Sequence, residues 1–130
     1  MNDKVTYWIE ISDYDFETAK AMLMTKRYLY VGFMCHQVIE KILKAYWSSV
    51  LEEPPLKIHH LSRLAAKSGI VQEMSEAQLE FIDKLEPLNI ESRYPSYKNQ
   101  LLKRLTPEYC ELLLSQTNEL RTWIKDKLLQ

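Results

Sequence analysis

The spacing of apolar residues follows a helical period along almost the whole chain, and the alternation typical of strands is nearly absent. This pattern predicts a protein made of helices. Only two of the 130 residues are glycine, which argues against sandwiches, barrels and glycine-rich phosphate-binding loops. We expect four long helices at about residues 5–25, 30–51, 75–88 and 106–128, and a shorter one that begins near His59 or His60 and ends at Ser68.

Residues at the ends of these segments carry helix start and stop signals. Gly69 is the expected C-terminal cap of the short helix, because glycine adopts the left-handed conformation found at such ends. Ser75 and Gln78 have the spacing of a capping box, which opens the next helix. Thr106 followed by Pro107 has the order of an N-cap and a proline in the first turn. These signals support the helix boundaries that the periodicity predicts.

Between the last two long helices, residues 89–104 are expected to form a loop with some short helix, in which Pro95 holds the backbone extended. The first helix is expected to turn Asp15 and its other charged residues outward. The predicted fold class is all-α: an antiparallel up-and-down bundle of four long helices plus one short helix. The chain has the length of one domain, which we expect to span residues 1–130.

The second predicted helix carries a row of polar residues beside a broad apolar arc. His36, Glu40 and Lys44 are spaced by four residues and share one helix face, with Lys41 further round. A helical projection places this row at the edge of the core. The row could present a hydrogen-bonding group, a carboxylate and a cation to one ligand. Alternatively, Glu40 and Lys44 form an ion pair within the helix, which contributes only a few tenths of a kcal/mol.

Two adjacent histidines, His59 and His60, lie where the short helix should begin. Neighbouring residues point in different directions, so at most one of them should face the core, and their plain role would be capping and packing. A zinc site would need two or three more ligands, and His36 is the only other histidine. The lone cysteines Cys35 and Cys110 have no CxxC partner and should be buried thiols in a reducing compartment. We therefore expect neither a metal nor another cofactor.

The segment Arg93-Tyr94-Pro95 is followed by further aromatic and basic residues, namely Tyr97, Lys98, Lys103 and Arg104. Arg93 offers a fixed fork of donors that suits a phosphate or a carboxylate. Basic side chains interleaved with tyrosines are typical of sites for nucleotides or single-stranded nucleic acid, where the charge meets phosphate and the ring stacks on a base. Alternatively, the segment is a solvated loop in which Arg93 pairs with a carboxylate such as Glu40.

Three of these segments resemble the HEPN family, a group of small helical domains associated with nucleotides and RNA. They are residues 36–45 (HQVIEKILKA), the two prolines 54–55 followed by residues 58–61 (IHHL), and residues 91–95 (ESRYP). The resemblance covers about residues 5–128. In the family, the histidine of the second segment is followed by an acidic or amide residue and then leucine. His59 and Leu61 match this motif, whereas His60 departs from it.

Ribonuclease members of the family carry a histidine separated by four to six residues from the arginine. In those members the histidine acts as general acid or base, and the arginine stabilises charge on the phosphate. The corresponding positions after Arg93 are Lys98, Asn99 and Gln100, and none of them can replace histidine as an acid–base group at neutral pH. The ribonuclease motif is therefore absent, and an enzymatic role is not our leading prediction.

The resemblance implies a non-catalytic nucleotide-binding module that is the partner of a separately encoded minimal nucleotidyltransferase, as in a toxin–antitoxin pair. In that hypothesis Arg93 and Lys44 contact phosphates, Glu40 orients Arg93, and Tyr94 or Tyr97 stacks on a base. His36, Lys41 and His59 complete the candidate site. One alternative is a metal-independent endoribonuclease toxin that uses Arg93 with another histidine. A second alternative is a structural homodimer, whose polar face holds helices together.

Charge and hydropathy limit the surroundings of the chain. The formal net charge is −1, so no global basic field would draw the protein to nucleic acid. The polar N-terminal residues do not form a signal peptide, and no stretch approaches the roughly 18 apolar residues of a membrane span. We expect a cytoplasmic protein with no membrane partner, which forms homodimers and binds a nucleotide or an RNA.

Overall fold

The computed structural model describes residues 2–91 and 95–130, without the side chains of residues 90–91 and 95–97. This part of the chain contains helices and no strands, which confirms the predicted fold class. The elements are α1 (Asp3–Met24), α2 (Tyr28–Val50), α3 (Leu61–Ser68), the 3₁₀ helix η1 (Ile70–Glu73), α4 (Glu76–Glu91), α5 (Pro95–Arg104) and α6 (Pro107–Leu128).

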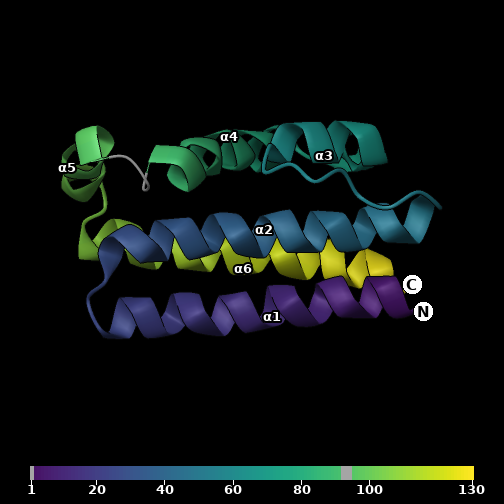
Figure 1. Cartoon of the computed structure of the whole chain (residues 1–130), viewed down its shortest axis with the longest axis horizontal. Helices are drawn as coiled ribbons and strands as arrows, with labels where there is room; N and C mark the ends of the chain where they lie inside the picture. The colour runs from purple at the N-terminus through teal and green to yellow at the C-terminus, as the bar shows by residue number, and fades with distance from the viewer. Residues whose placement is uncertain (1, 92–94) are drawn as a thin grey trace.

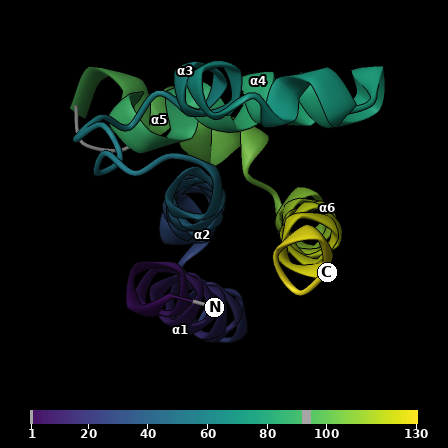
Figure 2. The same cartoon turned by 90° about the vertical axis from the view of Figure 1, so that its right-hand side faces the viewer.

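Helix α2 is the centre of the bundle and contacts the five other α-helices. Figure 1 shows α1 running opposite to α2 and α6, and Figure 2 shows α4 lying across α2. Seen nearly end-on in Figure 2, α1, α2 and α6 lie together, while α3, α4 and α5 form a layer on the other side of α2. A helix covered on both sides needs a broad apolar surface. Val38, Ile39, Ile42 and Leu43 are accordingly fully buried.

The predicted helix ends are present in the structure. The hydroxyl of Ser75 accepts the backbone N–H of Gln78, and the Gln78 side chain accepts the N–H of Ser75, at 3.1 and 2.9 Å. Thr106 caps α6 by accepting the N–H of Tyr109, and Pro107 begins the helix. Gly69 ends α3 with a φ of 89°, a conformation that favours glycine. Short-range signals thus place these ends.

The segment before α6 is more regular than the sequence predicted. Residues 95–104 form a helix of ten residues, and Pro95 begins it instead of holding an extended backbone. Proline is compatible with this position because the first turn of a helix needs no N–H donor from it. Leu101 and Leu105 bury the inner side of this segment, while its other described side chains are exposed. With so few apolar positions, the sequence of this segment shows only a weak helical period.

Across the helices that the structure describes, none combines the length and the apolar character of a membrane span.

Candidate functional site

Glu40 is the centre of a polar group that we call the Glu40 cluster: the buried residues His36, Glu40 and Lys44, and the half-exposed His59. The Lys44 ammonium lies 3.1 Å from Oε2 of Glu40, and Nδ1 of His59 lies 2.8 Å from Oε1. Nδ1 of His36 is 3.8 Å from the same Oε1. The fold therefore brings four of the predicted site residues together around one carboxylate.

The cluster is deeper than the helical projection predicted. His36 and Glu40 are 0% and 1% exposed, and Lys44 is 7% exposed. His59 reaches Glu40 from the segment between α2 and α3. The ring of Trp8 in α1 lies 5.4 Å from the Lys44 ammonium, close enough for a cation–π contact. Two neighbouring elements thus cover a helix face that a projection of α2 alone leaves at the edge.

The charges of the cluster are stabilised from within it. Burial by itself would raise the pKa of Glu40, but the hydrogen bond with His59 and the charge of Lys44 outweigh it and lower that pKa. Burial lowers the pKa of His36 to about 4, although the nearby Glu40 carboxylate acts in the opposite direction. At neutral pH the buried set therefore contains an ionised Glu40 and a neutral His36. Lys44 is committed to Glu40 and offers little surface to a phosphate.

The two neighbouring histidines face different carboxylates. Since an ionised carboxylate only accepts, Nδ1 of His59 donates its proton to Glu40. The His59 side chain is nevertheless 53% exposed. His60 caps α3 instead: its Nδ1 accepts the backbone N–H of Arg63 at 3.3 Å and lies 3.4 Å from Glu86. One histidine thus faces inward and the other caps the helix.

Lys41 belongs to a separate chain of polar contacts. Its ammonium lies 2.9 Å from the Gln37 side-chain oxygen and 3.4 Å from Asp15 of α1. The amide nitrogen of Gln37 donates to Asn89 of α4 at 2.9 Å. These four residues connect α1, α2 and α4 and position Lys41 away from Glu40.

The structure describes the remaining predicted site residues only in part or not at all. Arg93 and Tyr94 are not among the described residues, and the side chain of Tyr97 is not described. The contact between Glu40 and Arg93 stays a prediction. Both Glu40 oxygens already have a partner, His59 on one and Lys44 on the other.

Sequence reasoning missed three side chains of these networks. Asp15 was expected to point outward, but its side chain is 15% exposed because it pairs with Lys41. Asn89 lies in α4, and no local pattern relates it to Gln37, 52 residues earlier. Glu86 accepts the backbone N–H groups of Leu61 and Ser62 at the start of α3. The acidic character of the α4 sequence was visible, but which carboxylate would cap α3 was not.

Within the described part of the chain, no three histidine, cysteine or acidic side chains are arranged to hold a metal ion. Cys35 and Cys110 are free, buried thiols. Burial raises the pKa of Cys35 to about 12 and that of Cys110 to about 11. Both thiols are therefore protonated at neutral pH and fill space as small apolar groups.

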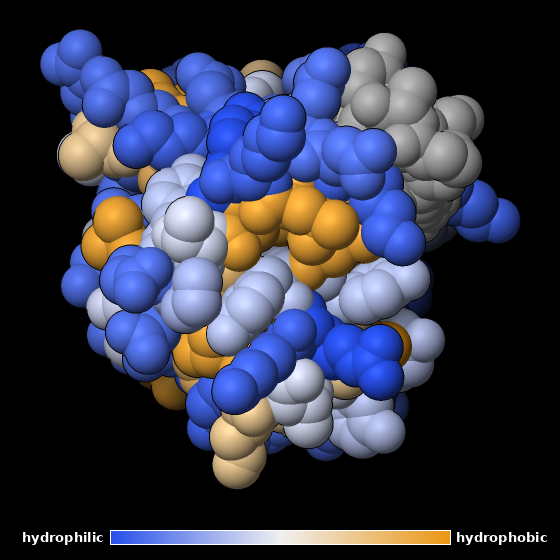
Figure 3. Space-filling view, turned by 90° about the vertical axis from the view of Figure 1, so that its left-hand side faces the viewer, coloured by the Kyte–Doolittle hydropathy of each residue, from blue (hydrophilic) through white to orange (hydrophobic). Residues whose placement is uncertain are grey.

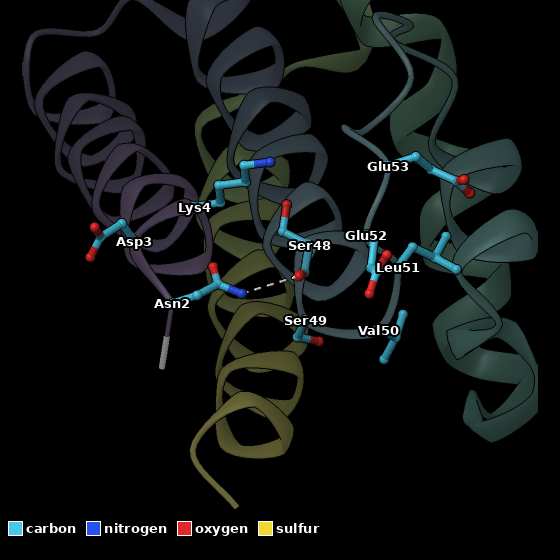
Figure 4. Close-up of a pocket in the computed structure, with 9 residues that line it drawn as sticks. All are labelled: Asn2, Asp3, Lys4, Ser48, Ser49, Val50, Leu51, Glu52 and Glu53. Atoms are coloured by element: carbon cyan, nitrogen blue, oxygen red, sulfur yellow. Dashed lines mark hydrogen bonds between the residues drawn. The ribbon is translucent and has the colours of Figure 1, made fainter.

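Several hollows lie on the surface of the bundle, and two of them are at its opposite ends. The hollow in Figure 4, about 510 Å³, lies where α1 begins and α2 ends, and the Asn2 amide donates to the carbonyl of Ser48 there. Its charged side chains are Asp3, Lys4, Glu52 and Glu53. Three carboxylates against one ammonium disfavour a phosphate at this end.

The hollow at the opposite end, about 290 Å³, lies between α4, α5 and α6 and is here called the α5 hollow. It is lined by Lys84, Leu88, Leu101, Arg104, Leu105 and Tyr109. Figure 3 shows this end of the molecule, where apolar surface is bordered by hydrophilic side chains. Two cations and a tyrosine beside apolar side chains, with no acidic residue in the lining, favour a ligand that is both anionic and partly apolar.

Comparison with known proteins identifies a family whose sequence model matches this chain. The model of the HEPN domain family matches residues 5–127. The crystal structure of TT1696 from Thermus thermophilus is similar in fold, with a TM-score of 0.82 and 18% identity. The match covers 97% of this chain and 99% of that one. No protein with a curated description matches.

Acidification should destabilise the protein through His36. Its ordinary pKa of 6.5 falls to about 4 on folding, so between these values the unfolded chain binds more protons. The contribution of His36 to the free energy of unfolding is therefore fully present above pH 6.5. As the pH falls toward 4, this contribution decreases by about 3 kcal/mol. The lowered pKa of Glu40 acts in the same direction below its ordinary 4.5. Urea unfolding at pH 7, 5.5 and 4 measures the change.

The matched variant for this measurement is His36→Gln, which cannot titrate. It should be less stable than the wild type at pH 7 but lose less stability between pH 6.5 and 4. Equal losses in the two proteins would show that His36 does not cause the pH dependence.

Proposed function

This chain belongs to the HEPN domain family, and from that membership we propose that it is a cytoplasmic, non-catalytic nucleotide-binding module that pairs with a separately encoded minimal nucleotidyltransferase. In this role the two proteins form a toxin–antitoxin-like pair. The proposal has three parts: the absence of ribonuclease chemistry at the usual position, a surface for the nucleotide, and a partner.

The observation that carries the proposal concerns α5. Lys98, Asn99 and Gln100 occupy the positions at which ribonuclease members of the family have a histidine, and all three are exposed on this helix. An amide cannot exchange a proton near neutral pH, and an exposed lysine ammonium is a poor general base there. Binding without cleavage is therefore the activity that this segment supports.

The α5 hollow is the surface on which we place the nucleotide. Lys84 and Arg104 border it, and Lys98 and Lys103 extend the positive charge along α5, which has no acidic residue. Tyr109 offers a ring for stacking, and the cations offer charge to phosphates. Arg93 and Tyr94 directly precede α5 in the sequence and Tyr97 belongs to it, and these three residues complete the proposed site. The Glu40 cluster then acts by holding the helices rather than by contacting the nucleotide.

Affinity purification from the native cell extract tests the module and its partner. Mass spectrometry should identify a small protein with a nucleotidyltransferase active-site sequence, together with a released nucleotide. The double variant Lys84→Gln/Arg104→Gln should lose most of the nucleotide because it loses two charges at the α5 hollow. Lys4→Gln/Lys20→Gln removes the same charge from α1 and should retain it. Recovery of shortened RNA, or of neither component, would contradict the proposal.

We also propose that the module is a homodimer. Tyr7 and Tyr14 lie seven residues apart on α1, so they share one face, and they are 55% and 75% exposed. Large exposed aromatic side chains grouped on one surface are typical of protein interfaces.

Light scattering of the purified chain should give about twice the 15.5 kDa of one copy. Tyr14→Glu should shift the mass toward one copy, because it places a charge in the apolar contact. Leu129→Glu adds the same charge at another exposed apolar position and should leave the mass unchanged. A wild type with the mass of a single copy at high concentration would refute the dimer.

One observation favours the second candidate, a metal-independent endoribonuclease. A carboxylate that holds Nδ1 of a histidine fixes the tautomer in which Nε2 can accept a proton, as in the triads of hydrolases. Glu40 and the half-exposed His59 have this arrangement. His59 could then act as the base that activates a ribose hydroxyl, with Arg93 on the phosphate.

Expression in a host cell separates the two candidates. If the chain is a ribonuclease, the wild type and His60→Ala should slow growth. His59→Ala and Arg93→Ala should restore growth, because each should lower the RNA cleavage rate by at least about 100-fold. Equal growth and intact RNA in all four strains would reject this candidate. His60 is the matched control because it is also exposed but caps α3 instead of contacting Glu40.

A further inference from the structure

The three histidines of this chain lie in three different environments, so their reactivities can be compared with one another in a single molecule. His36 is fully buried. His59 and His60 have similar side-chain exposures of 53% and 61%. Nδ1 of His59 lies 2.8 Å from the buried Glu40 carboxylate, whereas Nδ1 of His60 accepts the backbone N–H of Arg63 at 3.3 Å and lies 3.4 Å from the less buried Glu86.

These contacts have opposite effects on the two exposed rings. A carboxylate that accepts from Nδ1–H directs the lone pair to Nε2 and stabilises positive charge that forms on the ring. A backbone N–H that donates to Nδ1 requires the lone pair there, so the proton of neutral His60 is on Nε2. His59 therefore presents a nucleophilic nitrogen at the surface, and neutral His60 does not.

The segment that carries His59 is rich in basic residues, while Glu40 lies against the His59 ring and Glu86 against the start of α3. No acidic residue occurs among residues 54–72, which contain Lys57, Arg63 and Lys67. The side chains of these three cations are exposed, and none of them forms an ion pair with another described residue. Positive charge near a nucleophile raises the local concentration of a phosphate-bearing reagent.

We propose that Nε2 of His59 is an acceptor site for a phosphoryl group from a small energy-rich donor such as an acyl phosphate. The Nε2 lone pair attacks phosphorus and forms an N–P bond, while the P–O bond to the acyl group breaks and a carboxylate leaves with the electron pair. The proton on Nδ1 stays in the hydrogen bond with Glu40, whose negative charge offsets the positive charge gained by the ring. The proposal does not depend on the nucleotide-binding function, because His59 is not among the residues that line the α5 hollow.

Phosphoramidate is a suitable probe, because it transfers its phosphoryl group to imidazole nitrogen and releases ammonia as its P–N bond breaks. The folded wild-type chain is treated at pH 7, and phosphohistidine is mapped by mass spectrometry without acid steps. His59 should be modified about ten times faster than His60, since positioned partner groups accelerate such reactions by an order of magnitude or more. His36 should remain unmodified while the chain is folded.

Glu40→Gln is the variant that tests the cause. An amide cannot offset the charge on the ring, so the ratio of His59 to His60 modification should fall toward one. Lys67→Gln removes one nearby cation and should lower the His59 rate only by the change in local charge. Equal rates for His59 and His60 in the wild type would overturn the proposal, and this comparison needs no variant to fold. An unchanged ratio in folded Glu40→Gln would overturn the role of Glu40.

Discussion

A carboxylate buried at the centre of a helical bundle is the constraint on which much of this structure depends. Moving an ionised group out of water is costly unless it is paired and hydrogen-bonded. Glu40 lies on α2, the helix that contacts the other five, and its partners come from two places: Lys44 from α2 and His59 from the segment before α3. Satisfying one charge therefore fixes the position of a segment that has no regular structure of its own.

Because of this constraint, the residues that hold the helices together differ from those that could contact a ligand. Lys44 and His36 are buried and engaged with Glu40 or its surroundings, so they contribute to the shape of the bundle. Other cations lie away from Glu40, at the α5 hollow and on α3. His59 belongs to both groups of residues, because its Nδ1 contacts Glu40 while about half of its side chain is exposed to solvent.

Membership in the HEPN family and the similarity to TT1696 describe the scaffold, and at 18% identity the structural likeness extends to the fold alone. The motifs on which the sequence resemblance rests imply two local departures of this chain from the family pattern. His60 replaces an acidic or amide residue and caps α3. Lys98 to Gln100 replace the histidine of the ribonuclease members. Function in such a scaffold is decided by these side chains rather than by the bundle.

The sequence by itself determined the helical class, the caps at Gly69, Ser75 and Thr106, and the common face of His36, Glu40 and Lys44. All of these depend on contacts between residues three or four positions apart, which a linear pattern records. The tertiary structure decided that this face is buried, that His59 and not His60 meets Glu40, and that Asp15 and Asn89 turn inward. It also decided that residues 95–104 form a helix. Among its described side chains, Leu101 is the one that is buried, and Leu105 is buried just after the helix, so the local pattern is weak. Contacts between residues 19 to 52 positions apart depend on which helices pack together, and no local spacing encodes them.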